Sequence, residues 1–132
     1  MVIEPRRTDS PDDLRGRTKE FALRVVRLFR AMPKDEAGRI LGRQVLRAGT
    51  SVAANYRAAC RARSKAEFVA KLGVAVEEAD ETVFWLELLG DAGIMPKDRL
   101  RPLLGESNEL LAILAASRRT AKQSITKSPN HQ

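Results

Sequence analysis

The residues of this sequence whose types and spacing suggest chemistry are cations in one stretch of the chain. Between Ala37 and Ala66 there are seven Lys or Arg residues and no Asp or Glu. On a helical wheel at about 100° per residue, five of these arginines fall within roughly 80° of one another. We call them the arginine ridge: Arg39, Arg43, Arg47, Arg57 and Arg61. Such a ridge suits contact with a phosphate backbone, which needs cations spread along a surface and no base-specific geometry.

Two further cations, Arg63 and Lys65, continue the charge beyond the ridge and complete the predicted nucleic-acid-binding set. A structural interpretation competes with this one. The segment 66–91 carries seven carboxylates and one cation, Lys71, so a neighbouring antiparallel helix could pair with the ridge. Each exposed pair would add only about 0–1 kcal/mol. Both interpretations, a free ridge and a paired one, stay open at this point.

Catalytic and metal chemistry find little support in the sequence. A metal-binding bundle would use Glu-x-x-His motifs, but the only histidine, His131, stands at the end of the chain. Ser51, Ser64 and Cys60 have no histidine in a helical segment to act as a base. No glycine loop of the phosphate-cradling kind is present. We therefore expect no catalytic residue, no metal, no cofactor and no enzymatic activity.

Composition adds broad bounds. The 132 residues fit one domain, and 24 Lys and Arg against 17 Asp and Glu give a formal charge of +7, which favours polyanionic partners. The single cysteine, Cys60, fits a reducing compartment. No apolar run approaches the roughly 20 residues that a membrane span needs, and no signal-peptide pattern opens the chain. We expect a cytoplasmic protein with no membrane partner.

Apolar residues recur at helical spacing in four segments. Ser10 followed by Pro11 marks the first helix start, Pro33 its end, and Ser64 with Glu67 forms a capping box before the third helix. The pattern predicts helices at about 10–32, 35–62, 65–91 and 97–122, between a flexible arm at 1–9 and a disordered tail at 123–132. The fold class expected is all-α, an antiparallel up-down four-helix bundle. Two long hairpins exchanged between subunits would produce the same pattern.

Three glycines lie inside the second of these helices. Gly38, Gly42 and Gly49 each cost up to about 1 kcal/mol relative to alanine in a helix interior. The close approach of a neighbouring helix is the natural explanation for them.

One group of apolar residues does not fit the core face of the third helix. Phe84 and Leu88 fall about 160° to 200° from Phe68 on the wheel, and Trp85 falls between the two sides. Large apolar groups opposite a core usually mark contact with a further element or subunit. We therefore predict an oligomer interface at Phe84, Trp85 and Leu88.

A family resemblance comes from the second and third helices. The residues that carry it are the run Ser51-Val52-Ala53-Ala54-Asn55-Tyr56-Arg57, then Ser64-Lys65, Phe68, Lys71-Leu72, Ala75, Glu78, Glu81-Thr82 and Trp85-Leu86-Glu87-Leu88-Leu89. This set resembles the bacterial four-helix-bundle proteins named after open reading frames in 23S rRNA intervening sequences. The other two helices match only in length and pattern.

The resemblance implies a subunit that assembles into a ring, commonly a homopentamer, without established enzymatic activity. A related protein, the accessory variability protein of diversity-generating retroelements, has a basic surface and binds nucleic acid. Family members often carry an acidic residue where this chain has Ala58, which leaves the basic helix here more purely cationic.

The resemblance also implies structural roles for Asn55, Glu78 and Glu81. Asn55 lies at the border of the apolar seam, where a partly buried amide needs hydrogen-bond partners. We expect it to bond between helices or between subunits. The leading functional expectation is an oligomeric, non-enzymatic bundle that binds the backbone of RNA or DNA, and the alternative is a protein-interaction scaffold with no nucleic-acid role.

Overall fold

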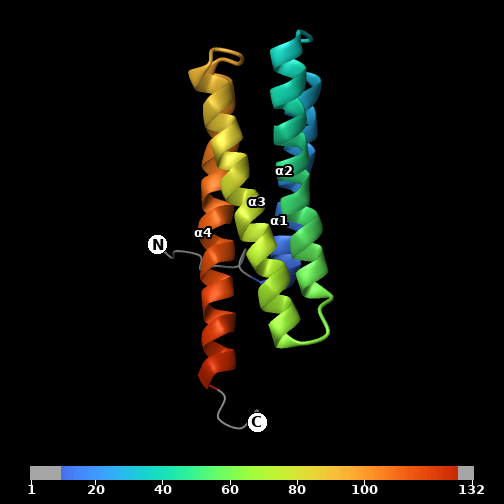
Figure 1. Cartoon of the computed structure of the whole chain (residues 1–132), viewed down its shortest axis with the longest axis vertical. Helices are drawn as coiled ribbons and strands as arrows, with labels where there is room; N and C mark the ends of the chain where they lie inside the picture. Colours follow the sequence, from blue (N-terminus) through green and yellow to red (C-terminus); the bar gives the residue numbers. More distant parts are fainter. Residues whose placement is uncertain (1–9, 128–132) are drawn as a thin grey trace, which may run out of the picture.

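The computed structural model describes residues 10–127, and its regular elements there are four helices. They are α1 (Pro11–Arg30), α2 (Glu36–Cys60), α3 (Lys65–Asp91) and α4 (Lys97–Lys127). Short connections join them into two hairpins that lie side by side, with α1 behind α2 and α4 beside α3 (Figure 1). The all-α four-helix bundle is therefore the fold, as the sequence pattern predicts.

Each of the first three helices begins at a side-chain cap. The backbone amides of Asp13, Gly38 and Glu67 donate to the side chains of Ser10, Asp35 and Ser64 at 3.1, 2.8 and 3.0 Å. The Glu67 carboxylate in turn accepts a hydrogen bond of 2.9 Å from the backbone amide of Arg63. These bonds satisfy amides that the first helical turn leaves without partners, which fixes where the helices start.

The fourth helix is longer than the sequence pattern predicts. The expected tail at 123–132 is wrong for its first part, because α4 continues to Lys127, and residues 128–132, like the expected arm at 1–9, lie outside the described residues. Polar side chains do not end a helix, and no glycine or proline interrupts the sequence between Gly105 and Pro129. Lys65 at the start of α3 also donates a hydrogen bond of 2.7 Å to the hydroxyl of Ser124, which holds this end of α4 against α3.

The core runs along the centre of the bundle, where apolar residues of all four helices meet. The larger apolar residues with no more than 1% of their surface exposed come from all four helices and are Leu14, Phe21, Val25, Val45, Val52, Leu72, Leu86, Leu89, Leu110 and Leu114. Removing such a side chain from water stabilises the fold by about 1.5–3 kcal/mol each. The core therefore holds all four helices in one unit.

Small residues bring α1 and α2 close together, as predicted for Gly42 and Gly49, whereas Gly38 instead faces the backbone carbonyl of Pro33 in the connection before α2. A Cβ atom placed on Gly49 would lie 2.7 Å from Cγ2 of Val25, and one on Gly42 would lie 3.2 Å from the ring of Phe29. Both distances are too short for comfortable packing, so α1 occupies the space that a side chain would need. The two helices therefore pack closely, and we call the outward-facing line along which they meet the α1–α2 groove.

The contact between α1 and α4 is short and charged. Arg17 of α1 makes a two-pronged contact with Glu106 of α4, at 2.7 Å from Nε and 2.8 Å from Nη2, and it reaches Glu109 at 2.6 Å. The bond to Glu106 raises the pKa of the Arg17 guanidinium above its ordinary value. Within the part of the chain described, α2 lies between α1 and α3, and α4 packs mainly on α3.

No helix among residues 10–127 is long and apolar enough to cross a membrane.

Candidate nucleic-acid interface

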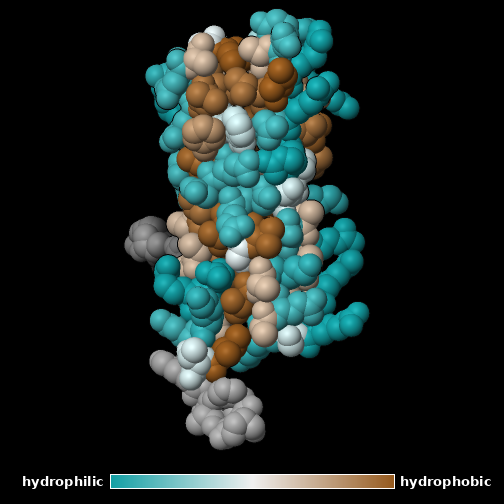
Figure 2. Space-filling view, in the orientation of Figure 1, coloured by the Kyte–Doolittle hydropathy of each residue, from teal (hydrophilic) through white to brown (hydrophobic). Residues whose placement is uncertain are grey.

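The arginine ridge follows the outer side of α2, and all five of its side chains are exposed. The α2 side of the molecule, on the right in Figure 2, carries long hydrophilic side chains, whereas apolar groups gather along the seam between α3 and α4. On the helical wheel Arg47 falls at the edge of the ridge opposite to Arg39 and Arg57. The two edges of the ridge therefore face different helices.

The Arg47 edge faces α3 and is paired. One guanidinium nitrogen of Arg47 lies 3.2 Å from Glu78, and the other contacts the carboxylate of Glu81. Glu81 also accepts a hydrogen bond from the indole nitrogen of Trp85 at 3.0 Å. Arg47 therefore takes part in a contact between α2 and α3 while remaining partly exposed, and its place in the binding set stays a prediction. Glu78 and Glu81 act as structural polar groups in this contact.

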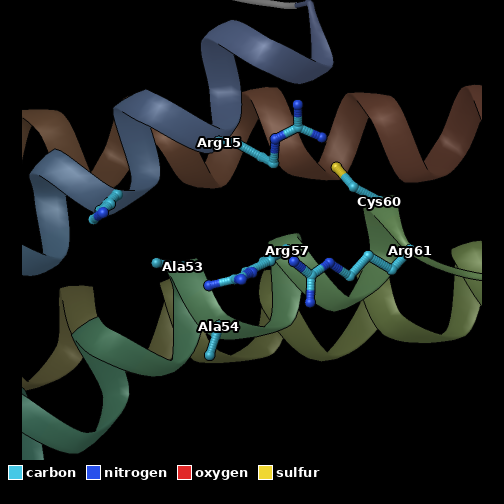
Figure 3. Close-up of a pocket in the computed structure, with 7 residues that line it drawn as sticks. Arg15, Ala53, Ala54, Arg57, Cys60 and Arg61 are labelled. Atoms are coloured by element: carbon cyan, nitrogen blue, oxygen red, sulfur yellow. The ribbon is translucent and has the colours of Figure 1, made fainter.

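The opposite edge of the ridge faces α1 and meets cations there. Arg57 and Arg61 of α2 line a cavity of about 490 Å³ together with Arg15 and Lys19 of α1. Figure 3 shows Arg15 extending from α1 toward the sulfur of Cys60, with Arg57 and Arg61 on the facing helix. No carboxylate lines this cavity. We call it the cationic pocket.

A second group of cations lies at the other end of the same groove. A smaller cavity of about 160 Å³ brings together Arg39 of α2, Arg30 of α1 and Lys34 of the connection between them, again without a carboxylate. Lys34 donates to the backbone carbonyl of Arg30 at 3.2 Å, which holds it near the end of α1. Positive charge therefore recurs along the groove between α1 and α2.

The structure separates the last two residues of the predicted binding set. Arg63 is exposed in the connection after α2 and extends the basic surface. Lys65 donates to Ser124 of α4, so its charge lies on the α3–α4 side of the bundle. Lys65 therefore contacts α4, and its part in binding stays a prediction.

The side chain of Asn55 forms a hydrogen bond within its own helix. Its amide nitrogen donates to the backbone carbonyl of Ser51, one turn earlier in α2, at 2.9 Å. The predicted bond between helices is therefore wrong within the subunit, because a short amide side chain on a helix reaches the carbonyl four residues back. A bond between subunits stays a prediction.

Tyr56 and Cys60 lie one turn apart beside the cationic pocket. Tyr56 is buried, with 3% of its surface exposed. Burial raises the pKa of its hydroxyl above the ordinary value, and the neighbouring Cys60 side chain adds to this effect. Cys60 is half-buried and unpaired, and it lines the cavity.

The predicted oligomer residues form a partly exposed apolar patch on α3. Phe84 has 53% of its surface exposed, and its ring meets that of Trp85 edge to face, with centroids 5.0 Å apart. Leu88 and Trp85 are half-buried. We call Phe84, Trp85 and Leu88 the α3 apolar patch.

Among residues 10–127 there is no group of His, Cys, Asp and Glu side chains arranged to hold a metal ion. Four carboxylates of α3 instead have other partners: Glu67 caps its own helix, Glu78 and Glu81 pair with Arg47, and Asp91 pairs with Lys97. His131 lies outside the described residues.

Arg15 and Lys19 line the cationic pocket but are not among the residues that the sequence predicts for the site. A helical wheel describes one helix at a time, whereas the pocket takes its cations from two helices. A signal existed: Arg15, Lys19, Val26 and Arg30 follow helical spacing, which places them on one face of α1. Knowledge of the α1–α2 pairing was needed to set that face against Arg57 and Arg61.

Four helices packed around one apolar core, with charged side chains on their outer faces, define a small helical-bundle protein with a basic groove. Comparison with known proteins gives the family. The sequence model of the family described as 23S rRNA-intervening sequence protein matches residues 13–116, so the chain belongs to that family. This finding confirms the resemblance seen in α2 and α3.

A solved structure supports the same assignment. A crystal structure of a protein of unknown function from the S23 ribosomal protein family of Bacteroides thetaiotaomicron VPI-5482 superposes with a TM-score of 0.77 at 32% sequence identity. The match covers 83% of this chain and 97% of the other. No curated protein matches the chain.

Proposed function

We propose that this protein is a non-enzymatic helical bundle of the cytoplasm that binds the backbone of RNA or DNA through the basic face of α1 and α2. One observation carries the proposal. Of the five ridge arginines, only Arg47 has an ion-pair partner among residues 10–127, and the other four are exposed. Pairing with α3 therefore accounts for little of the charge on α2, although α3 carries enough carboxylates to neutralise it.

The electrostatics of the groove point the same way. Unpaired cations on neighbouring helices repel one another, and a bound polyanion offsets that repulsion while releasing its own counterions. A helix face without a fixed pattern of donors suits contact with phosphates rather than with base edges. We therefore expect binding that depends weakly on sequence and strongly on salt.

The test compares two charge-matched double variants. Arg39→Gln/Arg43→Gln removes two exposed ridge cations, and Arg119→Gln/Lys122→Gln removes two exposed cations of α4, which lie beside Val76 of α3. Fluorescence anisotropy with a labelled duplex, at salt from about 50 to about 200 mM, should show that the ridge variant lowers the salt slope by about 1.8. The α4 variant should bind nearly as the wild type does.

Two outcomes would overturn the proposal. Absence of saturable binding to duplex DNA and structured RNA at low salt would leave the scaffold interpretation. Equal losses in both double variants would show that net charge, and not the α1–α2 face, attracts the nucleic acid.

The α3 apolar patch supports a second proposal, that the subunit self-associates. An exposed phenylalanine packed on a half-buried tryptophan is typical of a protein contact site. The family resemblance leads us to expect a pentamer, with five times the subunit mass of 14.7 kDa. Light scattering during size-exclusion chromatography measures this mass directly. Phe84→Ser should lower it, whereas Leu23→Ser, which removes another exposed apolar side chain, from α1, should not.

A further inference from the structure

The cationic pocket collects more positive charge than packing requires. Arg15 and Lys19 come from α1, and Arg57 and Arg61 come from α2, so four cations border one cavity. Only Arg15 has an ion-pair partner among residues 10–127, the exposed carboxylate of Asp12. Like charges gathered in this way are unfavourable unless an anion occupies the space between them.

The shape of the pocket suits a bound group. Ala53 and Ala54 contribute only methyl groups to its lining, so the space between the cations stays open. Its volume of about 490 Å³ lies in the range of ordinary ligand sites and exceeds the size of one phosphate. A phosphate with part of its attached nucleoside fits this space. Three guanidinium groups supply the planar, forked donors that bind phosphate oxygens in pairs.

The second cationic cavity argues for a chain of phosphates rather than one small anion. Arg39 and Arg57 are eighteen residues apart in α2, which is five helical turns, so they project from the same side of the helix. Each meets cations of α1 or of its connection to α2, at opposite ends of one groove. A polymer with regularly spaced negative charges can contact both ends.

We propose that the cationic pocket seats a backbone phosphodiester of bound nucleic acid, with Arg15, Lys19, Arg57 and Arg61 as its ligands. This inference rests on the proposed function and names the point where the backbone is held most firmly. Cys60, the only cysteine of the chain, lines the pocket and reports its occupancy.

The first test measures alkylation of Cys60 by iodoacetamide, a neutral reagent, with the full chain and a duplex of about 20 base pairs at low salt. Bound duplex should slow the reaction at least fivefold, and the protection should disappear as salt releases the duplex. Duplex that binds without protecting Cys60 would overturn the pocket while leaving the proposed function intact. Protection by inorganic phosphate alone, at a concentration equal to that of the duplex phosphates, would overturn the backbone assignment.

The second test uses variants that separate the two proposals. Lys19→Gln/Arg57→Gln should weaken duplex binding at least tenfold and abolish protection of Cys60, with circular dichroism confirming an intact fold. Asp12→Asn frees Arg15 from its carboxylate and should strengthen binding about two- to fivefold, a gain that misfolding cannot produce. If Lys19→Gln/Arg57→Gln loses no more affinity than Arg119→Gln/Lys122→Gln, the pocket does not bind the backbone phosphodiester. If the wild type does not bind duplex or structured RNA at all, the proposed function fails first.

Discussion

Arg17 and Glu106 join α1 to α4 through two parallel hydrogen bonds, at 2.7 and 2.8 Å, with about a fifth of each side chain exposed. A two-pronged pair with this degree of burial is stronger than an exposed ion pair. Because α1 and α4 touch only over a short stretch, this contact holds the first helix against the last.

The pair predicts unequal costs for its two carboxylate contacts. Arg17→Ala should lower the free energy of unfolding by about 2–3 kcal/mol, since it leaves the partly buried Glu106 without a partner. Glu109→Ala should cost less than about 1 kcal/mol, because that carboxylate is 69% exposed. Urea denaturation of both variants checks the difference, and equal costs would contradict it.

Gly49 predicts a packing penalty that can be isolated with a second glycine. Gly49→Ala gains the higher helix propensity of alanine but drives a methyl group against Val25, whereas Gly105→Ala meets no atom within 4 Å. Both variants gain the same helix propensity, so the difference between their free energies of unfolding reports the packing alone. It should be about 1–3 kcal/mol, with Gly49→Ala the less stable. Thermal denaturation is the measurement, and equal melting temperatures would show that α1 moves aside without cost.

Much of the fold could be predicted because its determinants are local. The caps at Ser10 and Ser64 and the apolar period set three helix starts within a residue or two, and Gly49 indicated a close helix neighbour. The end of α4 could not be placed from polarity, since solvent-facing polar residues continue a helix as readily as they leave one.

The candidate site was harder to predict because it depends on which helices are neighbours. The wheel aligned Arg39, Arg47 and Arg57, but only the fold shows that one edge of the ridge meets carboxylates of α3 and the other meets cations of α1. Charge totals for α2 and α3 leave a paired ridge and a free ridge equally open. The structure shows one paired arginine instead, because most carboxylates of α3 lie on faces that α2 does not reach.

Tyr56 predicts a loss of stability at high pH. It is the only tyrosine in the chain, so the near-ultraviolet absorbance of tyrosinate follows this residue alone. Burial raises its pKa in the folded protein, whereas the unfolded chain ionises near the ordinary value of about 10. Above this pH the unfolded state binds fewer protons than the folded state. The contribution of Tyr56 to the free energy of unfolding is therefore complete below about pH 10 and falls as the pH rises further.

The measurement for Tyr56 is the free energy of unfolding in urea at about pH 9 and about pH 11, compared with Tyr56→Phe. Lysines also titrate in this range, and the variant removes their contribution from the comparison. The wild type should lose more stability than Tyr56→Phe over the interval. Tyrosinate absorbance of the folded protein that appears near pH 10 would contradict the burial argument.

The two cationic cavities predict a minimum length for tight binding. Arg39 and Arg57 are eighteen residues apart in α2, which at 1.5 Å per residue separates the cavities by about 27 Å. Duplex DNA advances 3.4 Å per base pair, so about eight base pairs span that distance. Duplexes shorter than this reach one cavity only.

Affinity measured by anisotropy against duplexes of about 5 to about 16 base pairs should therefore rise steeply near eight base pairs and more slowly afterwards. Arg39→Gln should remove the steep rise, because it weakens the far cavity, while leaving the affinity for the shortest duplexes unchanged. A smooth increase with length in both proteins would mean that phosphates contact the groove without using its two ends as separate anchors. A rise that persists in Arg39→Gln would place the second anchor elsewhere on the bundle.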